Sequence, residues 1–287
     1  METMTERQII SRLRAGECFA AEIDTGSFQI VVRSYSPVVA TAIHDGHRVV
    51  DDFAAKMAVS EAQRKFEEDP HTGALGETLD ISITVRDSRY CGDLNRTEER
   101  CIYDEAWGLK VWREPLDDAS RLRLLENHRT YYRVLDALLS ELCSRYGTAL
   151  LFDLHSYNYE RLDGSPPLFN IGTHYIDMDR FGGEIDHLLD GLGAIELPDC
   201  ENRAVLDEVF VGRGYQAEFV HQNYPDVLCV PLELKKVFMD ARGFAIKKDI
   251  YEPLFAGTEK ALAASAAFFV ARGGADARAA GGHDARN

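Results

Sequence analysis

The sequence lacks several features that mark particular protein classes. It has 6 cysteines in 287 residues, and no two of them form a C-x-x-C pair. This spacing argues against a zinc ribbon or a disulfide framework and suits reduced thiols in a cytoplasm. No apolar run reaches the roughly 18 residues that a membrane helix needs, and the opening METMTERQIISRLRAGECF has no sustained apolar core. We therefore expect a cytoplasmic protein with neither a membrane span nor a signal peptide.

The sequence also has fewer basic than acidic residues. The chain has 32 Lys and Arg against 48 Asp and Glu, which gives a formal net charge of -16. A field of this sign opposes binding to nucleic acid and to anionic membranes, so neither is an expected partner. An anionic substrate would have to meet a local cluster of arginines. Hydrophobic residues make up 45% of the chain, which is enough for a large core and excludes general disorder.

Apolar runs rich in β-branched and aromatic residues alternate with segments of helical periodicity. The predicted strands are 28–34, 37–43, 79–85, 149–155 and 227–234. The predicted helices are 54–68, 117–147 and 250–271. This order predicts an α/β fold: a single domain over residues 1–272 whose mixed, mostly parallel central sheet is flanked by helices. Residues 273–287 are small and polar and are expected to form a disordered tail.

Polar side chains end several of the predicted strands. His44 and His155 each follow an apolar run, and Glu233 ends a third. Ligands of open α/β sheets bind beyond the carboxyl ends of the strands, so these residues could meet in one crevice. Two imidazoles and a carboxylate would suit a catalytic zinc site with an open position for water. The alternative for each histidine taken alone is a structural role, as a hydrogen-bonded residue at the rim of the core.

Further candidates lie near these strand ends. His47 completes an H-x-x-H pair with His44, a spacing that could face one ion from a tight turn. The acidic segment Glu67, Glu68, Asp69 ends a predicted helix, where carboxylates oppose the helix dipole and need positive charge nearby. Arg89 and Arg96, in SRYCGDLNR, could bind a substrate carboxylate with their planar guanidinium groups. A surface salt bridge is the alternative for each arginine.

Taken together, these motifs resemble a known family. HDGH, EEDPHTG, SRYCGDLNR, DEAWGLKVW, FDLHSYN, NIGT and LELKKVFMD occur in the order seen in N-formylglutamate amidohydrolases. The resemblance spans about residues 37–243. It implies a zinc-peptidase-like (phosphorylase/hydrolase-like) α/β fold and Zn²⁺-dependent hydrolysis of the amide bond of a small anionic N-acyl amino acid.

The resemblance also implies roles for particular residues. His44 and His155 are the expected metal ligands, and His47, Glu68 or Asp69 is the third. Glu233 matches the general base, and Asn95 with Arg96 matches the pair that holds the substrate carboxylate. Ser156 and Tyr157 are expected to line the pocket. Asp153 is expected to point to the opposite face of its strand.

The sequence departs from the histidine-degrading deformylases of the family. Those enzymes resemble P-H-S-G or P-H-A-G, whereas Ile43 precedes the histidine here and Asp45 follows it. The acyl group of the substrate therefore stays open. A zinc carboxypeptidase, another acyl-amino-acid deacylase, or a non-catalytic binding protein on the same fold are the alternatives.

Overall fold

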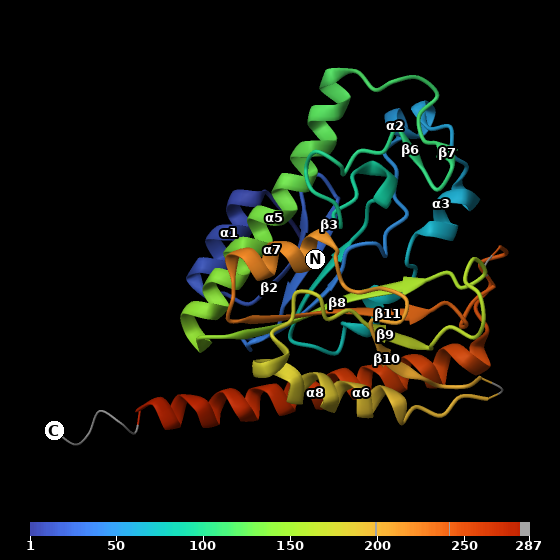
Figure 1. Ribbon diagram of the computed structural model, residues 1–287. Coiled ribbons are helices and arrows are strands. Elements are labelled where there is room, and N and C mark those ends of the chain that lie inside the picture. Colours follow the sequence, from blue (N-terminus) through green and yellow to red (C-terminus); the bar gives the residue numbers. More distant parts are fainter. Residues whose placement is uncertain (199, 241, 282–287) are drawn as a thin grey trace.

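A large mixed sheet forms the centre of the molecule (Figure 1). The computed structural model describes residues 1–198, 200–240 and 242–281. For Asp51 and residues 274–281 it describes the backbone alone. The nine strands of the sheet within the described residues are β1 (Glu2–Met4), β2 (Phe19–Ile23), β3 (Phe28–Val32), β4 (Val38–Ala42), β5 (Ile81–Val85), β8 (Ala149–Tyr157), β9 (Phe169–Ile171), β10 (Ala204–Leu206) and β11 (Val227–Lys235). Their spatial order is β1-β2-β3-β5-β4-β8-β11-β9-β10. The central strands β5, β4, β8 and β11 are parallel, whereas β3 and β9 join them antiparallel. The predicted mixed, mostly parallel sheet is confirmed.

Helices cover both faces of this sheet. They are α1 (Glu6–Ala15), α2 (Asp51–Lys56), α3 (Glu61–Glu67), α4 (Thr72–Leu75), α5 (Asp118–Tyr146), α6 (Met178–Gly193), α7 (Tyr215–Asn223) and α8 (Lys248–Gly281). Figure 1 shows α1, α5 and α7 on one side and α6 with α8 on the other. Each side has its own apolar cluster: α1 and α5 pack on one face, and α6 and α8 on the other. The predicted α/β class, with helices on both sides, is therefore correct.

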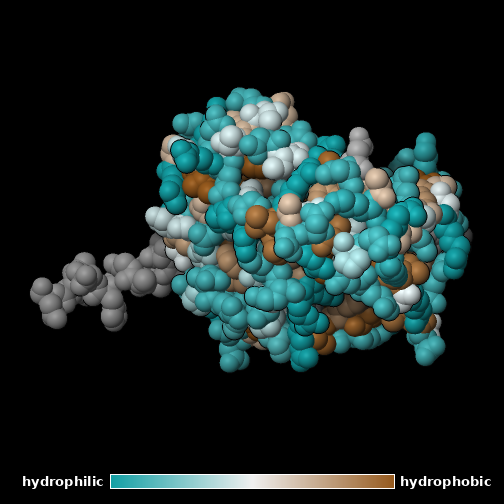
Figure 2. Space-filling view, turned by 90° about the horizontal axis from the view of Figure 1, so that it is seen from above, coloured by the Kyte–Doolittle hydropathy of each residue, from teal (hydrophilic) through white to brown (hydrophobic). Residues whose placement is uncertain are grey.

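A smaller apolar cluster lies under the loops above the sheet. It gathers α2 and the short hairpin of β6 (Glu105–Ala106) and β7 (Leu109–Lys110) around the buried Trp112. A one-turn 3-10 helix, Arg89–Cys91, packs into the same cluster. The face seen in Figure 2 is mostly hydrophilic, with hydrophobic residues in separate patches.

The predicted helix over 54–68 is two helices. α2 ends at Lys56, and α3 begins after Ser60, whose side chain forms a capping box with Gln63. Between them, Met57 pairs with Trp112 as an isolated β-bridge. A capping residue starts a new helix where its side chain accepts from the exposed N–H groups of the first turn. The predicted helix over 117–147 is confirmed as α5, which Asp117 caps at its start and Gly147, with φ of 75°, ends.

The C-terminal helix α8 is longer than the expected 250–271. Its portion Lys248–Gly273 is long and apolar enough, by composition, to cross a membrane. Its apolar residues Leu254, Leu262 and Phe269 are buried in the cluster shared with α6, which is the environment of a core helix. The tail expected at 273–287 falls partly within α8, and residues 282–287 lie outside the described residues.

The α5 core gives a test of this packing. Leu138 is fully buried between α5 and the sheet, whereas Leu122 on the same helix is 57% exposed. We expect Leu138→Ala to lower the free energy of unfolding by about 2–5 kcal/mol, because it removes buried methyl groups and leaves a cavity. Leu122→Ala, the matched control, should change it by less than about 0.5 kcal/mol. Urea unfolding followed by circular dichroism measures both; equal losses would contradict this packing.

Candidate active site

Three central strands deliver side chains to one end of the sheet. His44 follows β4, while His155 lies near the end of β8 and Glu233 near the end of β11. β8 is parallel to both of its neighbours, and Glu233 is the register partner of His155. The carboxyl ends of parallel strands meet at one edge of a sheet, so these residues are brought together although they are far apart in sequence.

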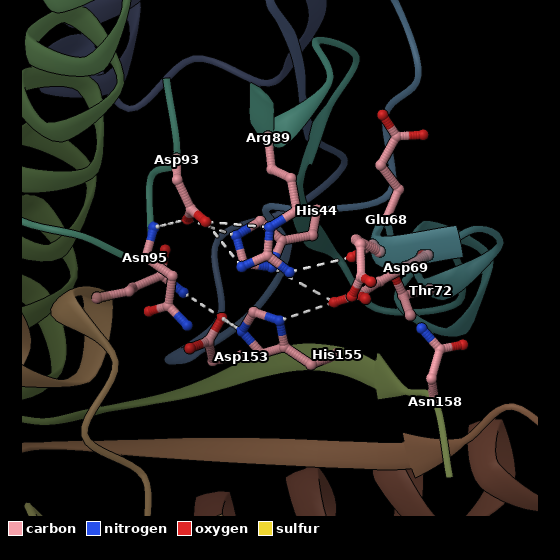
Figure 3. Close-up of polar contacts among 12 residues, drawn as sticks. His44, Glu68, Asp69, Thr72, Arg89, Asp93, Asn95, Asp153, His155 and Asn158 are labelled. Carbon is pink, nitrogen blue, oxygen red and sulfur yellow. Dashed lines mark hydrogen bonds and ion pairs between the residues drawn. The ribbon is translucent and has the colours of Figure 1, made fainter. Parts of the chain in front are cut away.

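Asp69, after α3, completes a cluster with the two histidines. Its Oδ2 lies 3.1 Å from Nδ1 of His155 and 3.4 Å from Nδ1 of His44. One ligand atom from each of the three residues lies within 4.8 Å of the other two, and all three residues are buried. The two imidazole rings have their centroids 4.9 Å apart. Figure 3 shows Asp69 on one side of both rings.

A second carboxylate supports each imidazole from the other side (Figure 3). Nε2 of His44 lies 2.8 Å from Asp93, and Nε2 of His155 lies 3.0 Å from Asp153. Such carboxylates orient the ring and leave its other nitrogen free to face an ion. The expectation that Asp153 faces away from His155 is wrong, because side chains two residues apart on a strand share a face.

Positive charge stabilises the acidic turn after α3. Lys236, which is buried, has its Nζ 3.6 Å from Oδ1 of Asp69 and donates to the backbone carbonyls of Phe66 and Glu68. Burial would raise the pKa of Asp69, but a hydrogen bond with His155, the polar contact with His44 and the Lys236 charge hold it well below its usual range. The positive charge that the acidic segment requires is therefore supplied at this turn.

Glu233 differs from Asp69 in its surroundings. Burial raises the pKa of Glu233 to about 7, and the nearby His155 partly opposes that rise. A carboxylate with a pKa near neutrality can both accept and return a proton at physiological pH.

The two candidate arginines are not equivalent. Arg89 donates from Nε and Nη2 to Asp93, at 3.0 and 2.7 Å, and from Nη1 to the carbonyl of Glu67. Arg96 donates a hydrogen bond from Nη1 to the carbonyl of Asn95, and its side chain is partly exposed. Buried Oδ1 of Asn95 has no hydrogen-bond partner within the described residues. Asn95 and Arg96 are therefore freer than Arg89 to bind a ligand.

His47 lies outside the cluster of His44, Asp69 and His155. Its Nδ1 pairs with Oε2 of Glu68 at 2.8 Å, and Glu68 also accepts from Ser88. The geometry thus brings Asp69 to the two histidines in place of the open alternatives His47 and Glu68.

One pocket of about 550 Å³ contains almost all of the predicted site residues. Those that line it are His44, Asp69, Arg89, Asn95, Arg96, His155, Ser156, Tyr157 and Glu233. Three supporting side chains were not predicted from the sequence. They are Asp93 beside His44, Asp153 beside His155, and Lys236 beside Asp69. Asp93 and Lys236 stand within the quoted motifs SRYCGDLNR and LELKK, which was the available signal.

The donor set of this pocket fits a divalent cation. Two imidazole nitrogens and a carboxylate oxygen are ligands that zinc prefers, and a three-ligand set leaves a position for water. Nδ1 of His44 is buried without a hydrogen-bond partner within the described residues, as expected of an atom that faces an ion.

The support that Asp153 gives to His155 can be tested directly. We expect Asp153→Asn to weaken zinc binding about 10- to 100-fold, because the ring loses the carboxylate that orients it. Competition with a chromophoric chelator measures the affinity. Asp186→Asn, at an exposed position on α6, is the control; equal affinity in the two variants would contradict the assigned support.

Comparisons with known proteins identify the family of this chain. The family model of N-formylglutamate amidohydrolase matches residues 36–238. N-formylglutamate deformylase of Pseudomonas aeruginosa is 29% identical over 244 residues, which cover 77% of this chain and 89% of the relative.

Two solved structures share the fold. N-formylglutamate amidohydrolase from Ralstonia eutropha superposes with a TM-score of 0.69 at 18% identity, over 86% of this chain and 99% of that one. The gene product Atu2144 from Agrobacterium tumefaciens gives a TM-score of 0.62 at 14% identity, over 85% and 96%. The members of the N-formylglutamate amidohydrolase family are hydrolases of amide carbon–nitrogen bonds. Because the family model matches more than half of this chain, the chain belongs to the N-formylglutamate amidohydrolase family.

Proposed function

We propose that this protein hydrolyses a small anionic N-acyl amino acid, N-formylglutamate being the example that its relatives' names provide, with the help of a bound zinc ion. The observation that carries the proposal is the cluster of His44, Asp69 and His155 beside Glu233 in one pocket. In the reaction, water adds to the amide carbonyl and the C–N bond breaks. The products are a carboxylic acid and an amino acid with a free amine.

His44, Asp69 and His155 would hold the ion. When bound, zinc lowers the pKa of a coordinated water from about 15.7 to about 7 and polarises a carbonyl group. Asp93 and Asp153 keep the two imidazoles in place, and Lys236 does the same for Asp69. The chain thus supplies both the ligands and a rigid support for each of them.

Glu233 is the proposed general base and acid. Its raised pKa, about 7, allows it to take a proton from the attacking water and to deliver it to the leaving nitrogen. Its register position beside His155 places the carboxylate next to the cluster.

Asn95 and Arg96 are the proposed holders of the substrate carboxylate. Both line the pocket, and a guanidinium group matches a carboxylate in shape and charge. In a chain of net charge -16, this local positive charge is needed to admit an anion. A cytoplasmic location, without nucleic acid or membrane partners, belongs to the same proposal.

Removal of the metal tests the proposal against a non-catalytic binding protein. Chelation should abolish hydrolysis of N-formylglutamate, and one equivalent of zinc per chain should restore it, because Glu233 alone, without a cation that lowers the pKa of the water and polarises the carbonyl, is too weak a base for this reaction. Metal analysis by mass spectrometry accompanies the assay. Full activity in protein shown to be free of metal would refute the proposal.

Glu233→Gln should lower kcat by about 100-fold or more while zinc stays bound, because the variant can no longer accept a proton. Glu252→Gln, exposed on α8, is the control. An unchanged kcat in the Glu233 variant would remove this residue from the mechanism.

Arg96→Met should lower kcat/KM by about 10- to 100-fold, mainly through a higher KM, because a charged hydrogen bond to the substrate carboxylate is lost. Arg180→Met on α6 controls for the loss of a surface charge. If the Arg96 variant retained its KM, another group would hold the carboxylate.

A further inference from the structure

Exposed hydrophobic side chains gather at the mouth of the pocket. The described residues include nine large hydrophobic side chains that are exposed, and four of them line this pocket: Trp107, Leu162, Phe210 and Val211. Each is 38–40% exposed. We call these four residues the apolar rim. Large hydrophobic groups grouped around a concave site mark a surface that a ligand covers.

The structure holds part of the apolar rim firmly in this exposed position. Asn170, fully buried on β9, donates to the carbonyl of Phe210 at 2.7 Å and accepts from the N–H of Val209 at 2.8 Å. The carbonyl of Val211 accepts from the N–H of His174. Asn170 is also the register partner of Glu233, so the loop is fixed to β9, the neighbour of the strand that carries the proposed base.

Trp107 is held in a similar way. It has a positive φ of 50° at the turn of the β6–β7 hairpin, and its ring packs on Tyr90 and Tyr103. The guanidinium group of Arg89 lies 5.0 Å from the ring centroid. The indole is thus ordered by its neighbours and remains 39% exposed.

Two residues of the apolar rim, Leu162 and Phe210, lie toward the end of the pocket away from Asn95. Figure 3 shows Asn95 on the side of Asp93 and Asp153, and Asn158 on the side of Asp69. Gly214, in the loop that also carries Phe210 and Val211, contacts Asn95, so this loop runs from the polar end along the pocket. At the other end, the ring centroids of Phe210 and Tyr157 lie 5.5 Å apart. Leu162 comes shortly after Asn158 in the chain, next to Arg161, whose guanidinium group pairs with Glu67. The cluster of His44, Asp69 and His155 lies between the two ends.

On the basis of the proposed amide hydrolysis, we infer that the substrate carries an apolar acyl group of several carbon atoms, which packs against the apolar rim. With the carboxylate at Asn95 and Arg96 and the amide at the cluster, the acyl group extends toward Tyr157, Leu162 and Phe210. A formyl group has a single carbon and no apolar chain that could cover these side chains. The volume of about 550 Å³ also fits a larger molecule than a formyl amino acid.

A series of substrates with equal amide chemistry tests this inference. We would compare kcat/KM of the zinc-loaded protein for N-acetyl-, N-butanoyl- and N-hexanoylglutamate, with N-formylglutamate as the reference for basic activity. The ratio of hexanoyl to acetyl should be about tenfold or more, since each covered methylene contributes up to about fourfold. A ratio of one or less would overturn the inference. Hydrolysis of the formyl compound alone would overturn it too, while leaving the proposed function intact.

Variants connect the preference to the apolar rim. Phe210→Ser and Leu162→Ser should each lower the hexanoyl-to-acetyl ratio, by about threefold to tenfold, because an apolar contact becomes polar. Leu122→Ser makes the same kind of change at an exposed position on α5, outside the pocket, and should keep the ratio of the unaltered protein. An unchanged ratio in both rim variants would overturn the assignment.

A binding measurement separates this inference from catalysis. The chain has two tryptophans, and Trp112 is buried, so Trp107 reports on the rim. In the Glu233→Gln variant, N-hexanoylglutamate should shift the tryptophan emission to shorter wavelength, and Trp107→Phe should remove that shift. A shift with N-hexanoylglutamate but no hydrolysis of any compound by the native protein would reject the proposed function and retain the apolar site. The absence of a shift at concentrations that saturate hydrolysis would reject the inference.

Discussion

The carboxylate of Asp69 is the contact that joins the parts of this site. It is almost fully buried, and it lies between the imidazoles of His44 and His155 and the ammonium group of Lys236. A buried carboxylate is costly unless charged or hydrogen-bonded groups surround it. The turn after α3 and the strands β4, β8 and β11 must therefore all be in place at once for this charge to be stable. The fold and the site thus depend on each other.

The same arrangement divides the pocket by function. Parallel strands bring the histidines and Glu233 to one edge, and the loops that follow supply the rest. Asn95 and Arg96 give one end of the pocket its polarity, in a chain that is strongly acidic overall. The loop fixed by Asn170 contributes Phe210 and Val211 to the apolar rim. The proposed orientation of the substrate depends on this division, because it assigns the carboxylate and the acyl group to separate surroundings.

Sequence patterns predicted the central strands and the strand-end residues well, because buried parallel strands are long apolar runs and polar residues that end them stand out. The short strands β1, β9 and β10, of three residues each, were missed because they carry little periodicity. Asp93, paired with both Arg89 and His44, could not be assigned, because a carboxylate in a loop looks the same whether it is buried or exposed. Long-range pairing also brings Asp69, and not His47, to the two histidines, which the sequence alone does not show.

The central claim is that two imidazoles and one carboxylate of this chain hold a single zinc ion. X-ray absorption at the zinc edge, measured on the zinc-loaded protein and on His44→Ala and His155→Ala, tests it most directly. The account predicts nitrogen and oxygen neighbours at about 2.0–2.2 Å, with scattering from two imidazoles that falls to one in each variant. Sulfur neighbours at about 2.3 Å, or imidazole scattering unchanged in both variants, would contradict it.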